Sequence, residues 1–181
     1  MVELASARPL QIEATSWLRA VPPLARLVFC GDASAEQALV AALDLPGPAA
    51  ACRAVTGGAR ASLWLGPDER LLLMHASQLL ATRQTLETAL ANHVHSLVDI
   101  SHRQIAFELH GPYAARLLNS QCPLDLALEA FPVGMCTRTL YSKAEIVLWR
   151  TAEDVFHVEV WRSFAPYVIT LLQAVAREYA L

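Results

Sequence analysis

Hydrophobic and polar positions alternate in several short runs of this chain, and stretches with helical periodicity lie between those runs. In "RQIAFELH", Ile105, Phe107 and Leu109 occupy every second position, a period that predicts a β-strand. Near the carboxyl terminus, apolar residues recur at helical spacing and predict a helix from about 164 to 179. That stripe consists of Phe164, Val168, Leu171, Leu172, Val175 and Tyr179. The chain is therefore predicted to combine strands with helices.

The same order of segments occurs twice along the chain. The first copy starts with a predicted strand at 24–30, followed by Gly31, a helix, the hairpin "ASLWLGPDERLLLM" and a helix near 81–92. The second copy starts with "RQIAFELHG" and continues through a helix with Pro112 in its first turn, where the missing N–H costs nothing. It ends with two or three strands and the final helix. Two pairs of residues align between the copies: Gly31 with Gly111, and Trp64 with Trp149.

A repeated strand–helix–hairpin–helix unit predicts the α+β class, with antiparallel or mixed sheets and helices packed on one face. The length of 181 residues fits a single domain, 1–181, with an internal pseudo-repeat of about 24–95 and 98–181. One unit alone would leave a sheet face and its edges uncovered, so we expect each half to be unfolded by itself. We also expect the helices of both halves to share one core. The positions expected there are Leu39, Leu86, Leu117 and Leu171.

The segment "VDISHRQ" places an acid, a hydroxyl and an imidazole within four positions. Asp99, Ser101 and His102 are the residue types of a hydrolase triad, but an extended chain would turn His102 away from the other two. A triad needs its base in contact with the nucleophile, and no G-x-S-x-G motif surrounds Ser101. We therefore interpret the three residues as structural, ordering the start of the second repeat. No catalytic residue is expected in the chain.

Other charged and aromatic positions have a functional and a structural interpretation. Arg103, Arg138 and Lys143 could hold an anionic ligand, although solvated strand positions are the more common role for such residues. Three tryptophans in or near predicted strands are interpreted as core or interface anchors: Trp64, Trp149 and Trp161. Neither a G-x-G-x-x-G nor a G-x-x-x-x-G-K-[ST] motif is present, which argues against a nucleotide-phosphate site. The four cysteines form no C-x-x-C pair, so no metal site is expected.

Composition constrains the surface. Charged residues make up 17% of the chain, against about 25% in ordinary soluble domains, and the hydrophobic fraction is 55%. Two explanations remain open: another protein covers part of the surface, or the sequence is biased toward alanine and leucine. A net charge of −3 and the lack of basic runs argue against nucleic acid or an anionic membrane as partner. No apolar run reaches the ~18 residues of a membrane span, and no apolar signal core is present, so a cytoplasmic location is expected.

Four separate stretches, in this order, resemble one family. They are "VDISHRQIAFELHGPYAARLL", "CPLDL", "FPVGMCTRTLYSKAEIVLWR" and "FHVEVWRSFAPYVITLL". Together they resemble the gamma subunits of heterotetrameric sarcosine oxidase, most clearly from about 61 to 172. The Asp-x-Ser-His, strand, Gly-Pro and helix portion is also similar to the folate-binding domain of the glycine cleavage T-protein. The family positions in that portion are Asp99, Ser101, His102, Arg103, Gly111 and Pro112.

This resemblance implies a function that the composition alone does not indicate. It implies a non-catalytic structural subunit in a complex that oxidatively demethylates sarcosine to glycine, with alpha, beta and delta subunits as partners. It places FAD, FMN, NAD and zinc on those other subunits and no cofactor in this chain. Two alternatives are a stand-alone folate- or pterin-binding protein and a fragment of an aminomethyltransferase. The stretch "FPVGMCTRT" departs from the K-G-C-[YF]-x-G-Q motif of small folate-binding relatives, and a full T-protein is about twice this length.

Overall fold

The computed structural model describes residues 14–47 and 50–180, which form strands, α-helices and two short 3-10 turns. The strands are β1 (Leu18–Ala20), β2 (Leu24–Gly31), β3 (Ala54–Gly57), β4 (Arg60–Gly66), β5 (Glu69–His75), β6 (His95–Asp99), β7 (Gln104–His110), β8 (Cys136–Tyr141), β9 (Ala144–Ala152) and β10 (Val155–Trp161). The helices are α1 (Ala33–Ala42), α2 (Leu79–Ala89), α3 (Ala114–Asn119) and α4 (Ala165–Ala176); the 3-10 turns are Ala76–Gln78 and Arg177–Tyr179. Within these residues no helix has the length and apolar character that a membrane crossing requires.

The strands form two five-stranded antiparallel sheets that share one internal order. The first sheet runs β3-β4-β5-β2-β6, and the second, read from its far edge, runs β8-β9-β10-β7-β1. Every strand of one sheet therefore has a counterpart in the other. The α+β class with a duplicated unit is confirmed. The N-terminal strand β1 takes the position in the second sheet that β6 takes in the first, so the spatial repeat is permuted relative to the chain order.

The register of the two sheets also agrees where the first strand of each unit ends. Cys30 pairs with Glu69, the first residue of β5, and His110 pairs with Val155, the first residue of β10. The strand that ends near Cys30 is thus equivalent to the one that ends at His110. The alignment of Gly31, the last residue of β2, with Gly111, which directly follows β7, is correct for the same reason.

Those two glycines are needed for different physical reasons. Each donates its backbone N–H to a carbonyl in the neighbouring hairpin turn, at 3.0 Å for Gly31 and 2.9 Å for Gly111. A Cβ at Gly31 would lie 2.6 Å from the ring of Phe29 and 2.9 Å from the methyl group of Ala35. A Cβ at Gly111 would meet nothing within 4 Å, but φ there is +94°, which side-chain-bearing residues rarely adopt. Crowding therefore requires glycine at the first position, and backbone conformation requires it at the second.

The predicted match of Trp64 with Trp149 is wrong by one residue. Trp149 pairs with the third residue of β10, whereas Trp64 pairs with the second residue of β5. The true counterpart of Trp149 is Leu63, which pairs with the third residue of β5. Neighbouring residues of a strand point to opposite faces, so Trp64 lies on the helix-covered side and Trp149 on the side that faces the other sheet.

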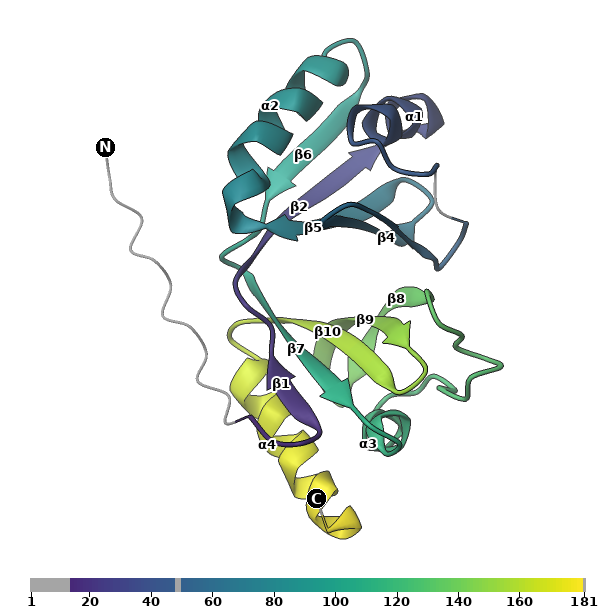
Figure 1. Ribbon diagram of the computed structural model, residues 1–181, viewed down its shortest axis with the longest axis vertical. Helices are drawn as coiled ribbons and strands as arrows, with labels where there is room; N and C mark the ends of the chain where they lie inside the picture. Colours follow the sequence, from purple (N-terminus) through teal and green to yellow (C-terminus); the bar gives the residue numbers. More distant parts are fainter. Residues whose placement is uncertain (1–13, 48–49, 181) are drawn as a thin grey trace, which may run out of the picture.

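The molecule has four layers in the order helix, sheet, sheet, helix (Figure 1). Helices α1 and α2 cover the outer face of the first sheet, and α3 and α4 cover the outer face of the second. Each sheet carries its helices on one face, as expected. The expected shared helical core is wrong, because Leu39 and Leu86 belong to one cluster, whereas Leu117 and Leu171 lie in another.

The two halves meet through the inner faces of their sheets. A third hydrophobic cluster fills that layer, with Leu63, Leu71 and Val147 among its buried members. An antiparallel bridge between Arg53 and Met135 joins the halves just before β3 and β8. The interface between the halves is therefore a contact of sheet on sheet, and any site that both halves build lies in this layer.

Candidate functional site between the two sheets

A group of charged side chains is buried between the sheets. Glu159, on the inner face of β10, is fully buried and accepts a hydrogen bond of 2.6 Å from Nε of Arg26 on β2. Nε2 of His157 lies 2.9 Å from the other carboxylate oxygen, which is hydrogen-bond distance. His157 and Glu159 are two positions apart in one strand, so they share a face. This group, here called the inter-sheet network, links the first half to the second.

The inter-sheet network holds Glu159 in its charged form. Burial would raise the pKa of Glu159, but the hydrogen bond and charge of His157 and the charge and hydrogen bond of Arg26 outweigh it, so that the pKa lies below its ordinary value. Arg26 also donates from Nη1 to the carbonyl oxygen of Leu24, at 2.8 Å. The two charged residues therefore satisfy each other, as buried ions must.

The Asp99–Ser101 segment joins this network through the backbone of β2. Oγ of Ser101 accepts a hydrogen bond of 2.9 Å from the backbone N–H of Arg26. Oδ1 of Asp99 accepts from the Ser101 hydroxyl at 2.6 Å and from the Ser101 backbone N–H at 2.9 Å. The carboxylate thus fixes the serine, and the serine fixes the strand that carries Arg26.

The remaining residues of the predicted motif lie outside this arrangement. His102 and Arg103 are exposed, and the described hydrogen bonds of His102 involve its backbone carbonyl, not its imidazole. Arg103 stacks on Trp161, with its guanidinium carbon 5.1 Å from the ring centre. Gly111 and the exposed Pro112 form the turn that leads into α3. Asp99 and Ser101 come together, but the structure does not bring the His102 ring to them.

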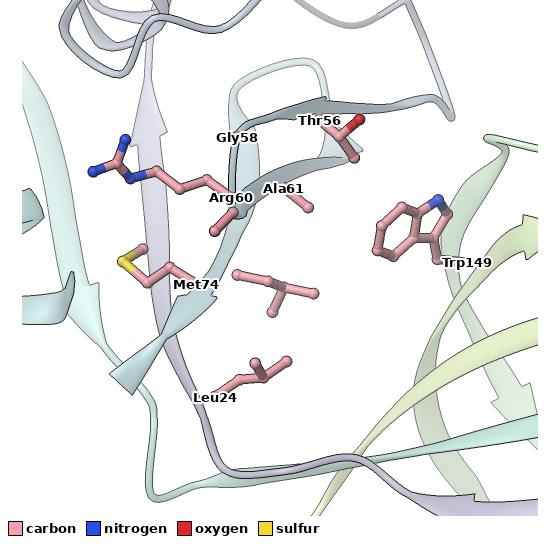
Figure 2. Close-up of a pocket in the computed structure, with 9 residues that line it drawn as sticks. Leu24, Thr56, Gly58, Arg60, Ala61, Met74 and Trp149 are labelled. Carbon is pink, nitrogen blue, oxygen red and sulfur yellow. The ribbon is translucent and has the colours of Figure 1, made fainter. Parts of the chain in front are cut away.

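A small cavity that is largely open to solvent lies between the sheets, beside the network. Its volume is about 260 Å³, which is below the usual range for small-molecule sites of about 300–1,000 Å³. The lining residues are Leu24, Thr56, Gly58, Ala59, Arg60, Ala61, Leu73, Met74 and Trp149. Figure 2 shows the guanidinium of Arg60 and the indole nitrogen of Trp149 turned away from the middle of the cavity, so its lining is mainly apolar. The lining of the cavity suits a small apolar group better than a charged ligand.

Trp149 connects the cavity to the network. Its ring lies 5.8 Å from the ring of His157, and its buried Nε1 has no hydrogen-bond partner among the described residues. The ring centre of Trp64, by contrast, lies 5.8 Å from the guanidinium carbon of Arg70. Nε of Arg70 donates a hydrogen bond of 2.7 Å to the carboxylate of Glu36 on α1. Of the three tryptophans singled out in the sequence, one lies between the sheets, one under a helix and one at the surface.

The sequence interpretation missed the network itself. Arg26, His157 and Glu159 stand in the otherwise apolar strands "LARLVFC" and "VFHVEVW". A charge at an inward-facing position of an apolar strand is a signal of a buried pair, since lone charges are rarely buried. The signal does not identify the partner, because Arg26 and Glu159 are 133 positions apart.

Replacing Ser101 with alanine should lower the free energy of unfolding by about 1 kcal/mol, because the N–H of Arg26 loses its acceptor. For a chain of this size that corresponds to a fall of about 2–4 °C in the thermal midpoint. Ser101→Thr keeps the acceptor oxygen and serves as the control. Thermal unfolding measures both variants, and an unchanged midpoint in Ser101→Ala would show that this hydrogen bond does not hold β2 in place.

Comparison with known proteins relates this arrangement to one family. Residues 30–178 match the family described as sarcosine oxidase, gamma subunit. The chain is 33% identical over 120 residues to the sarcosine oxidase subunit gamma of Corynebacterium sp. (strain P-1). The aligned region covers 66% of this chain and 58% of the relative, so this chain spans less than two thirds of the relative's length. It is 33% identical over 165 residues to the subunit gamma of Corynebacterium sp. (strain U-96), covering 90% of this chain and 75% of the relative.

Solved structures give the same result for the fold. A chain of the heterotetrameric sarcosine oxidase from Corynebacterium sp. U-96, in complex with pyrrole 2-carboxylate, matches with a TM-score of 0.83 and 30% identity, covering 91% of this chain and 85% of that one. The glycine cleavage system aminomethyltransferase T from Bartonella henselae matches with a TM-score of 0.67 and 15% identity, over 88% of this chain and 46% of that one, which shows a common fold alone. The chain belongs to the sarcosine oxidase gamma subunit family.

Proposed function

We propose that this chain is a structural and assembly subunit of a heterotetrameric sarcosine oxidase and contributes no catalytic residue to it. The observation that carries the proposal is the match over 91% of the chain, at a TM-score of 0.83, to a chain of a heterotetrameric sarcosine oxidase. Its partners are the alpha, beta and delta subunits, which carry the FAD, FMN, NAD and zinc. A cytoplasmic location belongs to the same proposal.

The chemistry of the inter-sheet layer supports a structural role. Glu159 and Arg26 are both buried and bonded to each other, and Ser101 is bonded to Asp99 and to the backbone of β2. Catalytic acids and bases must reach a substrate, whereas Glu159 and Arg26 are enclosed in the fold and bonded to each other. They are suited to hold two sheets in a fixed relation, which a subunit needs in order to present a constant surface.

Co-expression tests the proposal. The chain, carrying an affinity tag, is produced alone and together with the alpha, beta and delta subunits of its own organism. We expect the four to purify as one complex that makes hydrogen peroxide from sarcosine, and the chain alone to have neither flavin absorbance nor turnover. Sarcosine oxidation by the isolated chain, or a fully active complex that forms without it, would contradict the proposal.

A further inference from the structure

Three exposed aromatic residues lie within seven positions of the sequence at the start of α4. Trp161 ends β10, Phe164 directly precedes α4, and Tyr167 lies in its first turn, with exposed fractions of 39%, 42% and 40%. Phe164 is also the one residue of the predicted apolar stripe of this helix that is largely exposed, while Val168 and Leu172 are buried as expected. Large aromatic groups at the surface cost free energy in water and are enriched at protein interfaces.

Two of these side chains have side-chain contacts within the chain, and the backbone at Phe164 is also hydrogen-bonded. The backbone N–H of Phe164 donates to the carbonyl of Trp161 at 2.8 Å. The hydroxyl of Tyr167 donates to Oγ of Ser142, in the β8–β9 hairpin, at 2.9 Å. Arg103 stacks on Trp161. A surface fixed in this way loses little conformational entropy when a partner binds, which favours its use as a docking site.

Basic side chains border the aromatic groups at two ends. Arg103 lies on Trp161 at one end, and the exposed Lys143 follows Ser142 at the other. Among the described residues, neither forms a salt bridge. The nearby Glu145 faces Arg138 instead, at 3.7 Å. The chain as a whole is acidic, with a net charge of −3, so this local basic border is a distinct feature.

We propose that Trp161, Phe164 and Tyr167, bordered by Arg103 and Lys143, form the face on which this chain docks to a larger subunit of its complex. This inference rests on the proposed function. The partner surface is an apolar groove with carboxylates along its edge, since aromatic anchors need a desolvated pocket and the basic border needs opposite charge. A second copy of this chain is a poor partner, because a two-fold contact would bring two basic borders together.

A competition experiment tests the docking face. Wild-type and variant chains with different tags are co-expressed at equal levels with the alpha, beta and delta subunits, and their ratio is measured in the purified complex. We expect Phe164→Ser to be incorporated about 30-fold less than the wild type, the effect of losing an anchor of about 2 kcal/mol. Arg103→Glu should also reduce incorporation, and this loss should shrink at high salt.

Leu80→Ser is the matched control. Leu80 is 68% exposed at the start of α2, in the other half of the molecule, and its variant should be incorporated equally with the wild type. The isolated variants are first compared by thermal unfolding, and Tyr167→Ser replaces Phe164→Ser if the latter does not fold. Equal incorporation of the aromatic variant overturns the docking face and leaves the proposed function intact. If the wild-type chain itself is excluded from the complex, both the docking face and the proposed function are overturned. If the wild-type chain forms a homodimer and Phe164→Ser dissociates it, the choice of a larger subunit as the partner is overturned.

Discussion

Replacing Glu159 with leucine is expected to lower the free energy of unfolding by about 3–5 kcal/mol. Glu159 is fully buried, and its removal leaves the guanidinium of Arg26 buried without a carboxylate. His157 loses its partner as well. Urea unfolding followed by circular dichroism measures the change, and a loss below about 1 kcal/mol would show that the network does not hold the sheets together.

A double variant separates the effect of leaving Arg26 without its charge partner from the effect of replacing the Glu159 side chain. Arg26→Met with Glu159→Leu removes both charges, so it should recover most of the stability that Glu159→Leu loses. Arg83→Met is the surface control, because Arg83 and Glu87 form an exposed pair at 2.7 Å on α2. Its expected effect is about 0.3–0.5 kcal/mol. If Arg83→Met and Glu159→Leu lowered the free energy of unfolding equally, burial would not explain the larger effect expected at Glu159.

The same network predicts how stability depends on pH. The pKa of Glu159 is lowered in the folded chain relative to about 4.3 in the unfolded one. The contribution of Glu159 is therefore complete above that unfolded value and is lost as the pH falls through the lower folded pKa. Unfolding measured between pH 3 and pH 7 should show a steeper acid loss in the wild type than in the Arg26→Met, Glu159→Leu double variant.

The first half of the chain expressed alone, residues 24–103, is expected not to fold, although it contains every strand and helix of the first sheet. Its inner face would expose Leu63 and Leu71, which are almost fully buried in the intact chain, and Arg26 would lose Glu159. Near-ultraviolet circular dichroism and amide NMR dispersion test this. A cooperative thermal transition in the fragment would contradict the expectation.

The substitution Leu71→Ala, made in the full chain and in the fragment, provides a control for this prediction. In the full chain Leu71→Ala should cost about 2–5 kcal/mol, since it leaves a cavity in the layer between the sheets. In the fragment the same change removes an exposed apolar side chain and should reduce binding of a hydrophobic dye. The same effect in both settings would show that the fragment buries Leu71 without the second half.

The repeated unit could be predicted because its signals are local. Alternation in "RQIAFELH", glycine after each first strand and helical spacing near the carboxyl terminus depend on residues close in sequence. Strand β1 was missed because it has only three residues, Leu18–Ala20, and is defined by its pairing with β7. The one-residue error at Trp64 came from matching two tryptophans by residue type. Both hairpins have a pairing irregularity at equivalent positions, and the counterpart of Trp64 is Arg150.

Features that depend on distant pairs could not be predicted. The expected core shared by Leu39 and Leu117 assumed that helices cover helices, whereas the inner sheet faces are themselves apolar enough to meet. The role of Ser101 as a structural residue was inferred from the geometry of an extended chain. Its acceptor contact with Arg26, 75 positions away, required the fold.

Sarcosine turnover per assembled complex tests most directly whether this chain assembles the enzyme without taking part in its chemistry. The complex is purified with wild-type chain and with Ser101→Ala, and the rate of peroxide formation is divided by the amount of complete tetramer. We expect the two rates to agree within about threefold, since a structural hydrogen bond worth about 1 kcal/mol changes the stability of the subunit and not the reacting groups. A loss on the order of 10³-fold in fully assembled complex, the scale of a removed catalytic group, would contradict the structural role.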